Sequence, residues 1–306
     1  EFRTAKIVAD ELRALGLEVK SGIAHTGVIG ILRGGQPGPV IALRADMDAL
    51  PVTERVDVPF KSTVTTEYRG EKVGVMHACG HDAHTAILLG TAKALTGLRK
   101  DLPGTILFVF QPAEEGAPEG ELGGASLMLK EGAFDIVKPE AAFGLHVFST
   151  VNAGTIGYRS GSFMAASDRF RIVVKGRQTH GSRPWGGVDP IVVSSQIVMG
   201  LQTIVGRQID ISRYPAVVSV GAIKGNNNNN IIPDEVEMIG TFRTFDPAVR
   251  QQIIERITRT AQDIAHSAGA TATVEIAEDN NPVVVNDPTL TQRMLPSLAR
   301  VAGGQG

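Results

Sequence analysis

Three histidines and the only cysteine of this chain fall within residues 77–84, although the whole sequence holds only seven histidines. Cys79 and His81 stand two residues apart, and in an extended segment both side chains would leave the same face and share one metal ion. A helical pattern follows, and the N-terminus of a helix lowers the pKa of a nearby thiol and favours the thiolate that metals bind. The alternative, a helix cap at Asp82 with incidental histidines, explains the aspartate but not the cluster.

Two carboxylates, Glu114 and Glu115, directly follow the apolar residues 105–110. Adjacent side chains at the end of a strand point to opposite sides, so one carboxylate can bind a metal ion while the other faces a water held by that ion. General-base catalysis on a metal-activated water needs this division of roles. A pair of glutamates is more often solvated surface, and the pair alone is therefore a weak signal.

His146 stands at the end of another apolar run, residues 141–147. A lone histidine there is more often a buried residue with satisfied hydrogen bonds than a ligand, but three such features at strand ends are hard to dismiss together. Catalytic zinc takes about three protein ligands and an open position for water. The four candidate ligands are therefore one or two short of a full two-metal site: Cys79, His81, Glu115 and His146.

The elements that position these residues alternate between helical and strand patterns over the first 150 residues. Periodicity predicts helices over residues 1–15 and 82–95 and strands over residues 27–32, 40–44, 105–110 and 141–147. Apolar strands separated by helices favour an α/β fold, with a mixed, mostly parallel sheet covered by helices on both faces. Active sites in such sheets lie at the carboxyl ends of the strands.

The pattern changes near residue 161. Predicted elements then follow the order β-α-β-β-α-β of a ferredoxin-like α+β module, over residues 170–174, 189–205, 217–223, 235–244, 247–268 and 270–277. We expect a metal-binding catalytic domain of residues 1–160 and 280–306, which a helix over residues 287–301 rejoins. A ferredoxin-like lid and dimerisation domain, residues 161–279, is inserted in it. Five asparagines, residues 226–230, are expected at a hairpin tip.

The composition is that of an ordinary globular protein, with 42% hydrophobic and 20% charged residues among 306 and a net charge of −2. No basic run indicates a nucleic-acid partner, and no apolar stretch approaches the ~20 residues of a membrane helix. A single cysteine excludes a disulfide within the chain and favours a reducing compartment, so we expect a cytoplasmic protein. The chain opens without methionine inside a helical pattern and ends in a glycine-rich segment, and we expect both true termini to be missing.

Six motifs occur in the order seen in one known family: residues 45–51, 77–82, 111–116, 144–146, 179–181 and 240–244. The chain thereby resembles the aminoacylase/carboxypeptidase metallopeptidases over essentially its whole length. It is most similar to the amidohydrolase branch, which includes hippurate hydrolase, auxin–amino-acid conjugate hydrolases and N-acetyldiaminopimelate deacetylase.

The resemblance implies a divalent metal pair (zinc, manganese, cobalt or nickel) and Glu114 as the general base. Its implied ligands are Cys79, His81, Glu115 and His146. It further implies that Asp48, His77 and Asp82 orient the metal ligands without binding the metal themselves, although Asp48 could equally be a turn residue. A last ligand, a histidine of the family near the C-terminus, is expected in a missing segment.

In the inserted domain, the resemblance implies that His180 stabilises an oxyanion, often in the active site of the partner subunit. Asn230 and Arg243 are similar to the residues that grip a substrate carboxylate, for which the planar fork of arginine is suited. The alternatives are a loop asparagine and a surface arginine. A homodimer formed through the inserted domain is implied as well.

These observations predict an enzyme that hydrolyses the amide bond of N-acyl amino acids or short peptides. One alternative is a non-catalytic carboxylate-binding protein of the same fold, but a pure binding protein has no use for a base beside a metal ligand. A second alternative is an inactive fragment whose inserted domain only dimerises.

Overall fold

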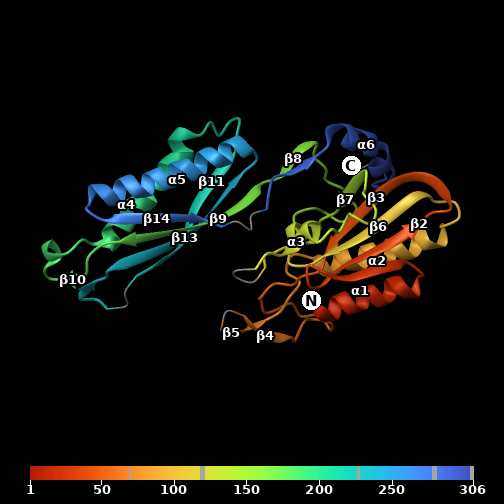
Figure 1. Cartoon of the computed structure of the whole chain (residues 1–306), viewed down its shortest axis with the longest axis horizontal. Helices are drawn as coiled ribbons and strands as arrows, with labels where there is room; N and C mark the ends of the chain where they lie inside the picture. Colours follow the sequence, from red (N-terminus) through yellow and green to blue (C-terminus); the bar gives the residue numbers. More distant parts are fainter. Residues whose placement is uncertain (69, 118–120, 226–227, 278–280, 304–306) are drawn as a thin grey trace. The chain divides into compact units, whose positions relative to one another are not determined.

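The chain forms two compact units, Glu1–Asn152 and Ala153–Gly306, in a computed structural model (Figure 1). The structure describes residues 1–68, 70–117, 121–225, 228–277 and 281–303. The predicted grouping of residues 280–306 with the first domain stays a prediction, and its boundary at residues 279 and 280 lies outside the described residues. Within the described ranges, no helix is long and apolar enough to cross a membrane.

A five-stranded sheet in the order β1-β2-β6-β3-β7 forms the centre of the first unit. Strands β6, β3 and β7 pair in parallel, while β2 is antiparallel to both β1 and β6, so four of the five strands run in one direction. The predicted mostly parallel sheet is thus confirmed. The strands are β1 (Glu18–Ile23), β2 (Gly27–Arg33), β3 (Gln36–Asp46), β6 (Pro103–Gln111) and β7 (Ala141–Gly144).

Helices cover both faces of this sheet, as the apolar strands require (Figure 1). Side chains alternate along β6, so that Phe108 packs against α1 (Phe2–Ala14) and α2 (His81–Gly97). Its neighbour Leu107 packs on the opposite face, where α3 (Gly124–Lys130) contributes to the core. Burying one such side chain stabilises the fold by about 1.5–3 kcal/mol. The sheet is therefore a rigid support for the loops at its carboxyl edge.

The second unit contains an antiparallel sheet in the order β11-β13-β9-β14, in which the order along the chain is β-α-β-β-α-β. The predicted ferredoxin-like arrangement is confirmed. Its elements are β9 (Ala166–Lys175), α4 (Pro190–Thr203), β11 (Ala216–Lys224), β13 (Glu235–Thr244), α5 (Pro247–Ser267) and β14 (Thr271–Ile276).

The two long helices of this module begin in the same way. Asp189 and Asp246 are N-caps whose carboxylates accept backbone N–H groups of the first turn, and a proline follows each of them. The face of α5 that enters the core repeats about every four residues: Val249, Ile253, Ile257, Ala261 and Ala265. This period is that of an amphipathic helix lying on a sheet.

Shorter elements complete the two units. In the first, β4 (Thr65–Tyr68) and β5 (Glu71–Gly74) form a hairpin. In the second, β10 pairs with β12 and β8 with β15. The remaining elements are β8 (Gly161–Met164), β10 (Thr179–His180), η1 (Pro184–Gly186), η2 (Ile204–Gln208), β12 (Ile231–Ile232), β15 (Val284–Asn286) and α6 (Pro288–Val301).

Candidate active site

The carboxyl ends of β3 and β6 lie side by side, because the two strands are parallel and Asp46 is in register with Gln111. The loops after β3, β6 and β7 therefore leave the same edge of the sheet. The predicted strand over residues 141–147 is shorter than expected, since β7 ends at Gly144 and leaves His146 on a loop. The N-terminus of α2 also lies at this edge, because the side chains of His81 and His84 contact Asp48 and Asp46 at the end of β3.

Three predicted ligands meet at this edge. The ligand atoms of Cys79, His81 and His146 all lie within 4.8 Å of one another. Cys79 Sγ is 3.4 Å from His146 Nε2, and the rings of His81 and His146 cross at 86°. The expectation of an extended segment between Cys79 and His81 is wrong. The chain turns there, and Gly80, with a φ of 86°, caps α2, so that the turn brings the two side chains together.

His81 occupies the centre of the cluster and is 1% exposed. Its Nδ1 is 3.0 Å from Asp48 Oδ1, which is the carboxylate–histidine arrangement found behind metal ligands. Its Nε2 is fully buried and has no hydrogen-bond partner among the described residues. Burial lowers the pKa of His81, but the hydrogen bond with Asp48 and the nearby carboxylates outweigh it and raise the pKa. A buried nitrogen without a partner, facing a thiol and carboxylates, fits a bound cation.

Both glutamates approach this nitrogen. Glu114 Oε2 and Glu115 Oε1 each lie 3.9 Å from His81 Nε2. The prediction that the two carboxylates must point to opposite sides is therefore wrong, because β6 ends at Gln111 and the alternation of an extended strand no longer holds. Ala113 takes a left-handed φ of 45° in this bend, and its N–H donates to a Glu1 carboxylate oxygen at 2.9 Å.

Asp48 connects His81 with the loop that carries the two glutamates. Besides its contact with His81, its second oxygen accepts the backbone N–H of Glu115 at 2.9 Å. Burial raises the pKa of Asp48, but these hydrogen bonds outweigh burial and lower it below its ordinary value. Asp48 is thus an ionised, buried support for both His81 and the glutamate loop, and its predicted role of orienting metal ligands stays a prediction.

The site has an excess of negative charge. Burial raises the pKa of Glu114, and Glu115, Asp46 and Asp48 add to this, while Arg44 opposes it. Burial, a hydrogen bond with Glu115 and the charges of Glu115, Glu114 and Asp46 raise the pKa of Cys79 to about 12. The expectation that the helix N-terminus lowers the pKa of this thiol is wrong, because burial and the carboxylates outweigh the helix dipole. A bound cation supplies the opposite charge and deprotonates such a thiol.

His77 and Asp82, which were also predicted to orient the metal ligands, have fewer contacts with the candidate ligands than Asp48 has. His77 is half-buried, and its Nδ1 is buried without a hydrogen-bond partner among the described residues. Asp82 lies in the first turn of α2 and is exposed, and its side chain makes no hydrogen bond or ion pair with the candidate ligands in the described part of the chain. The roles predicted for both stay predictions.

Sequence reasoning missed two buried residues of this site, Asp46 and His84, each with a side chain 1% exposed. His84 Nδ1 is 2.6 Å from Asp46 Oδ1, and Arg44 donates to the other oxygen of Asp46 at 2.8 Å. Two spacings could have found them. Asp46 shares a strand face with Asp48, and His84 follows His81 by three residues on one side of a helix.

The predicted residues of the second unit fall into two places. His180 and Asn230 are neighbours, since β10 and β12 pair with His180 opposite Ile231, and Gly181 N–H donates to Asn230 O at 2.7 Å. Both are exposed. Ser182 N–H donates to His180 Nδ1 at 3.1 Å, which leaves the proton of a neutral ring on the exposed Nε2. Two of the five asparagines, residues 226 and 227, lie outside the described residues.

Arg243 is half-buried near the other end of β13 and donates to the Thr241 hydroxyl and to Phe242 O. It is opposite Ser167, at the start of β9, whereas the β10–β12 pair follows the end of β9 (Figure 1). Between Glu235 and Arg243 an extended strand rises about 27 Å. Within one chain, Asn230 and Arg243 are therefore not brought together.

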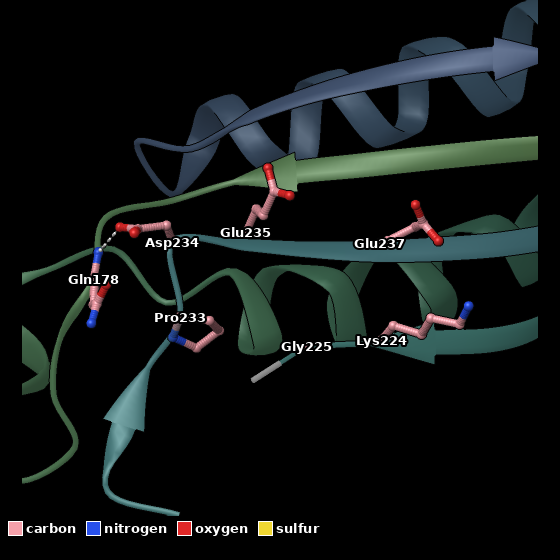
Figure 2. Close-up of a pocket in the computed structure, with 7 residues that line it drawn as sticks. All are labelled: Gln178, Lys224, Gly225, Pro233, Asp234, Glu235 and Glu237. Carbon is pink, nitrogen blue, oxygen red and sulfur yellow. Dashed lines mark hydrogen bonds between the residues drawn. The ribbon is translucent and has the colours of Figure 1, made fainter. Parts of the chain in front are cut away.

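A hollow of about 470 Å³ lies beside the start of β13 (Figure 2). It is lined by Gln178, Lys224, Gly225, Pro233, Asp234, Glu235 and Glu237. One oxygen of Asp234 accepts the backbone N–H of Gln178 at 2.9 Å, so this carboxylate holds a turn. These lining residues include none of the predicted site residues, and the chemistry lies at the sheet edge of the first unit instead.

The fold and the site define a class of protein. A mostly parallel α/β sheet that gathers a thiol, imidazoles and carboxylates at the carboxyl ends of its strands is typical of a metal-dependent hydrolase. The sequence matches the family Peptidase family M20/M25/M40 over residues 42–305, and the chain belongs to this family. The predicted membership and the prediction of an enzyme are confirmed.

Known relatives and solved structures agree with this. The chain is 43% identical over 303 residues to thermostable carboxypeptidase 2 of Saccharolobus solfataricus, covering 99% of this chain and 74% of that protein. It is 40% identical over 287 residues to the N-acyl-L-amino acid amidohydrolase of Geobacillus stearothermophilus, covering 94% and 74%. The structure of Bacillus subtilis YxeP, a dinuclear metal binding peptidase from the M20 family, matches with a TM-score of 0.77 at 38% identity, covering 98% and 74%. Together with the ligand clusters, these matches support a divalent metal pair here.

Proposed function

We propose that this protein hydrolyses the amide bond of N-acyl amino acids, with Glu114 as the general base beside a metal pair held by Cys79, His81, Glu115 and His146. The observation that carries the proposal is the convergence of both glutamates, at 3.9 Å, on the buried Nε2 of His81, which has no hydrogen-bond partner in the described part of the chain. The names of two relatives, a carboxypeptidase and an N-acyl-L-amino acid amidohydrolase, both denote hydrolysis of an amide bond and support this substrate class.

Divalent cations at this site would polarise the scissile carbonyl and acidify the attacking water. The donor set of sulfur, nitrogen and oxygen accepts zinc, manganese, cobalt or nickel, and a further histidine from outside this sequence is the expected last ligand.

Glu114 moves the proton in this proposal. Its carboxylate takes a proton from the attacking water and delivers it to the amine that leaves. A general base works best when its pKa approaches the working pH, and burial raises the pKa of Glu114 in that direction. Glu115, its neighbour, whose backbone N–H donates to Asp48, is assigned the role of metal ligand in this proposal.

Substrate recognition is proposed to need two chains. His180 and Asn230 share one end of the second unit, and Arg243 lies near the other, so one substrate carboxylate cannot reach both Asn230 and Arg243 of a single chain. A homodimer formed through the second unit would let His180 Nε2–H and Asn230 of one subunit complete the site of the other. His180 would then donate to the oxyanion while Arg243 binds the carboxylate.

The proposal is tested by hydrolysis of N-acetyl and N-benzoyl amino acids with the metal-loaded, full-length protein. Glu114→Gln should lower kcat by at least about a hundredfold, the scale of a lost general base, while metal content stays unchanged. Glu11→Gln, an exposed substitution on α1, is the matched control and should keep full rate. Substantial turnover by Glu114→Gln would show that the base is assigned wrongly. Absence of stoichiometric metal in the full-length wild type would favour the non-catalytic binding protein.

We also propose a cytoplasmic location. It is supported by the single cysteine, Cys79, which is free and lies in the candidate ligand set. A thiol that must bind metal is better preserved in a reducing compartment.

A further inference from the structure

His84 is buried next to the candidate ligands, but its ring is already fully engaged. Asp46, His81 and His84 have the spacing of a metal-binding group. However, His84 Nδ1 is 2.6 Å from Asp46 Oδ1, and His84 Nε2 accepts the backbone N–H of Val147 at 2.9 Å. Binding a cation through either nitrogen would break one of these buried hydrogen bonds. His84 is therefore not a ligand, and another role must explain its place.

These contacts fix the tautomer of His84. A backbone N–H can only donate, so His84 Nε2 carries no proton, and the proton on Nδ1 is donated to Asp46. Arg44 donates to the other oxygen of Asp46 at 2.8 Å, and the Thr85 hydroxyl donates to the Asp46 backbone carbonyl at 2.8 Å. Arg44 thus holds the carboxylate that engages the ring, whereas the Thr85 hydroxyl contacts only the backbone of Asp46.

The backbone of Val147 links His84 to a candidate metal ligand. While its N–H donates to His84, its carbonyl accepts a hydrogen bond from His146 Nδ1 at 2.7 Å. His146 therefore keeps its proton on Nδ1 and presents Nε2, the atom 3.4 Å from Cys79 Sγ. The His84 and His146 rings also pack directly, with centroids 4.7 Å apart.

Besides these contacts, the His146 ring packs on Phe148 with centroids 4.8 Å apart, but the loop that carries it is largely exposed. Strand β7 ends at Gly144, and the residues on either side of His146, namely Leu145 and Val147, are 48% and 41% exposed. Such a loop cannot fix an imidazole by core packing alone, so hydrogen bonds from a buried group must do so.

We propose that His84, with its tautomer set by Asp46, is a positioning residue that holds the backbone of Val147 and thereby the orientation and tautomer of His146 at the metal centre. This inference rests on the proposed role of His146 as a ligand. Partners of metal ligands commonly change metal affinity by 10- to 100-fold when they are removed.

The test compares zinc affinities of wild-type and variant full-length protein, measured by competition with a chromophoric chelator. His84→Phe keeps a buried ring but removes both hydrogen bonds. His84→Asn keeps an N–H donor near Asp46 and is too short to reach Val147. We expect both to bind one zinc ion about 10- to 100-fold more weakly than the wild type. The visible spectrum of the cobalt-loaded variants should also change, because a nitrogen ligand is lost or displaced.

Thr85→Val is the matched control. It removes a buried hydrogen bond to the same Asp46 residue but leaves the His84 ring engaged, so its zinc affinity should equal that of the wild type. Wild-type affinity in folded His84→Phe or His84→Asn would overturn the inference, and should His84→Phe not fold, His84→Asn decides. An equal loss of zinc affinity in Thr85→Val would also overturn the inference, since it would indicate a general effect of destabilisation. A wild type that binds no zinc would instead refute the proposed metal centre itself.

Discussion

Gly80 forms the turn between Cys79 and His81, with a φ of 86° that residues with a side chain rarely adopt. A Cβ at this position would lie 2.3 Å from Val147 Cγ2. At the scale of single residues, this glycine serves two purposes. It lets the thiol turn back toward His81, and it leaves room for the loop that carries His146.

We expect Gly80→Ala to weaken metal binding. The left-handed turn alone costs an alanine about 1–2 kcal/mol, and the displaced Val147 side chain would move the His146 loop. Metal content after dialysis, together with thermal unfolding, measures both effects. Gly90→Ala, in the same helix and with no atom near the added methyl group, should leave metal content unchanged and add about 0.5–1 kcal/mol of stability. Unaltered metal binding by Gly80→Ala would contradict the importance of this turn.

Elements with a long apolar period were predictable, and those without one were not. The strand over residues 235–244 and the helix starting at residue 247 match β13 and α5 closely, because many residues repeat the same pattern. The two-residue strands β10 and β12 and the seven-residue helix α3 were missed. Elements this short form only when tertiary contacts hold them, such as the burial of Met128 in α3.

Helix α5 contributes five buried side chains to the core of the second unit. A substitution that weakens this packing should destabilise the second unit without affecting the first. Ile257→Ala removes a fully buried side chain and should lower the free energy of unfolding of the second unit by about 2–5 kcal/mol. Denaturant unfolding measures this, and Arg259→Ala, exposed on the same helix, should change stability by less than about 0.5 kcal/mol. The core around Ile257 contains only residues of the second unit, so metal content should not change. A loss of metal in Ile257→Ala would show that the units depend on each other.

At the scale of the whole molecule, the two units carry different parts of the proposed chemistry. The first contains the candidate ligands and Glu114, and the second contains His180, Asn230 and Arg243. The separation of Asn230 from Arg243 along β13 is the feature that favours a site shared between two subunits.

Mixing two inactive variants tests this sharing. Glu114→Gln and His180→Ala chains should each be inactive, but a mixed dimer would contain one site with both residues intact. Random exchange of subunits should restore about a quarter of the wild-type activity, because half of the dimers are mixed and one of their two sites is whole. Glu114→Gln mixed with Glu115→Ala is the control and should restore nothing, since both residues belong to one site of one chain. No recovery in the first mixture would place His180 in the site of its own chain.

Local sequence patterns were enough to predict the α/β and ferredoxin-like modules, the family, and the residue types of the candidate metal site, because periodicity and ordered motifs involve residues close together in the chain. Which atoms meet depends on tertiary contacts. The tertiary structure turned both glutamates toward His81 Nε2 through the bend at Ala113, raised the pKa of the Cys79 thiol, and placed Asp46 and His84 behind His146. These outcomes depend on burial and on contacts between residues far apart in the chain, for which no local pattern exists.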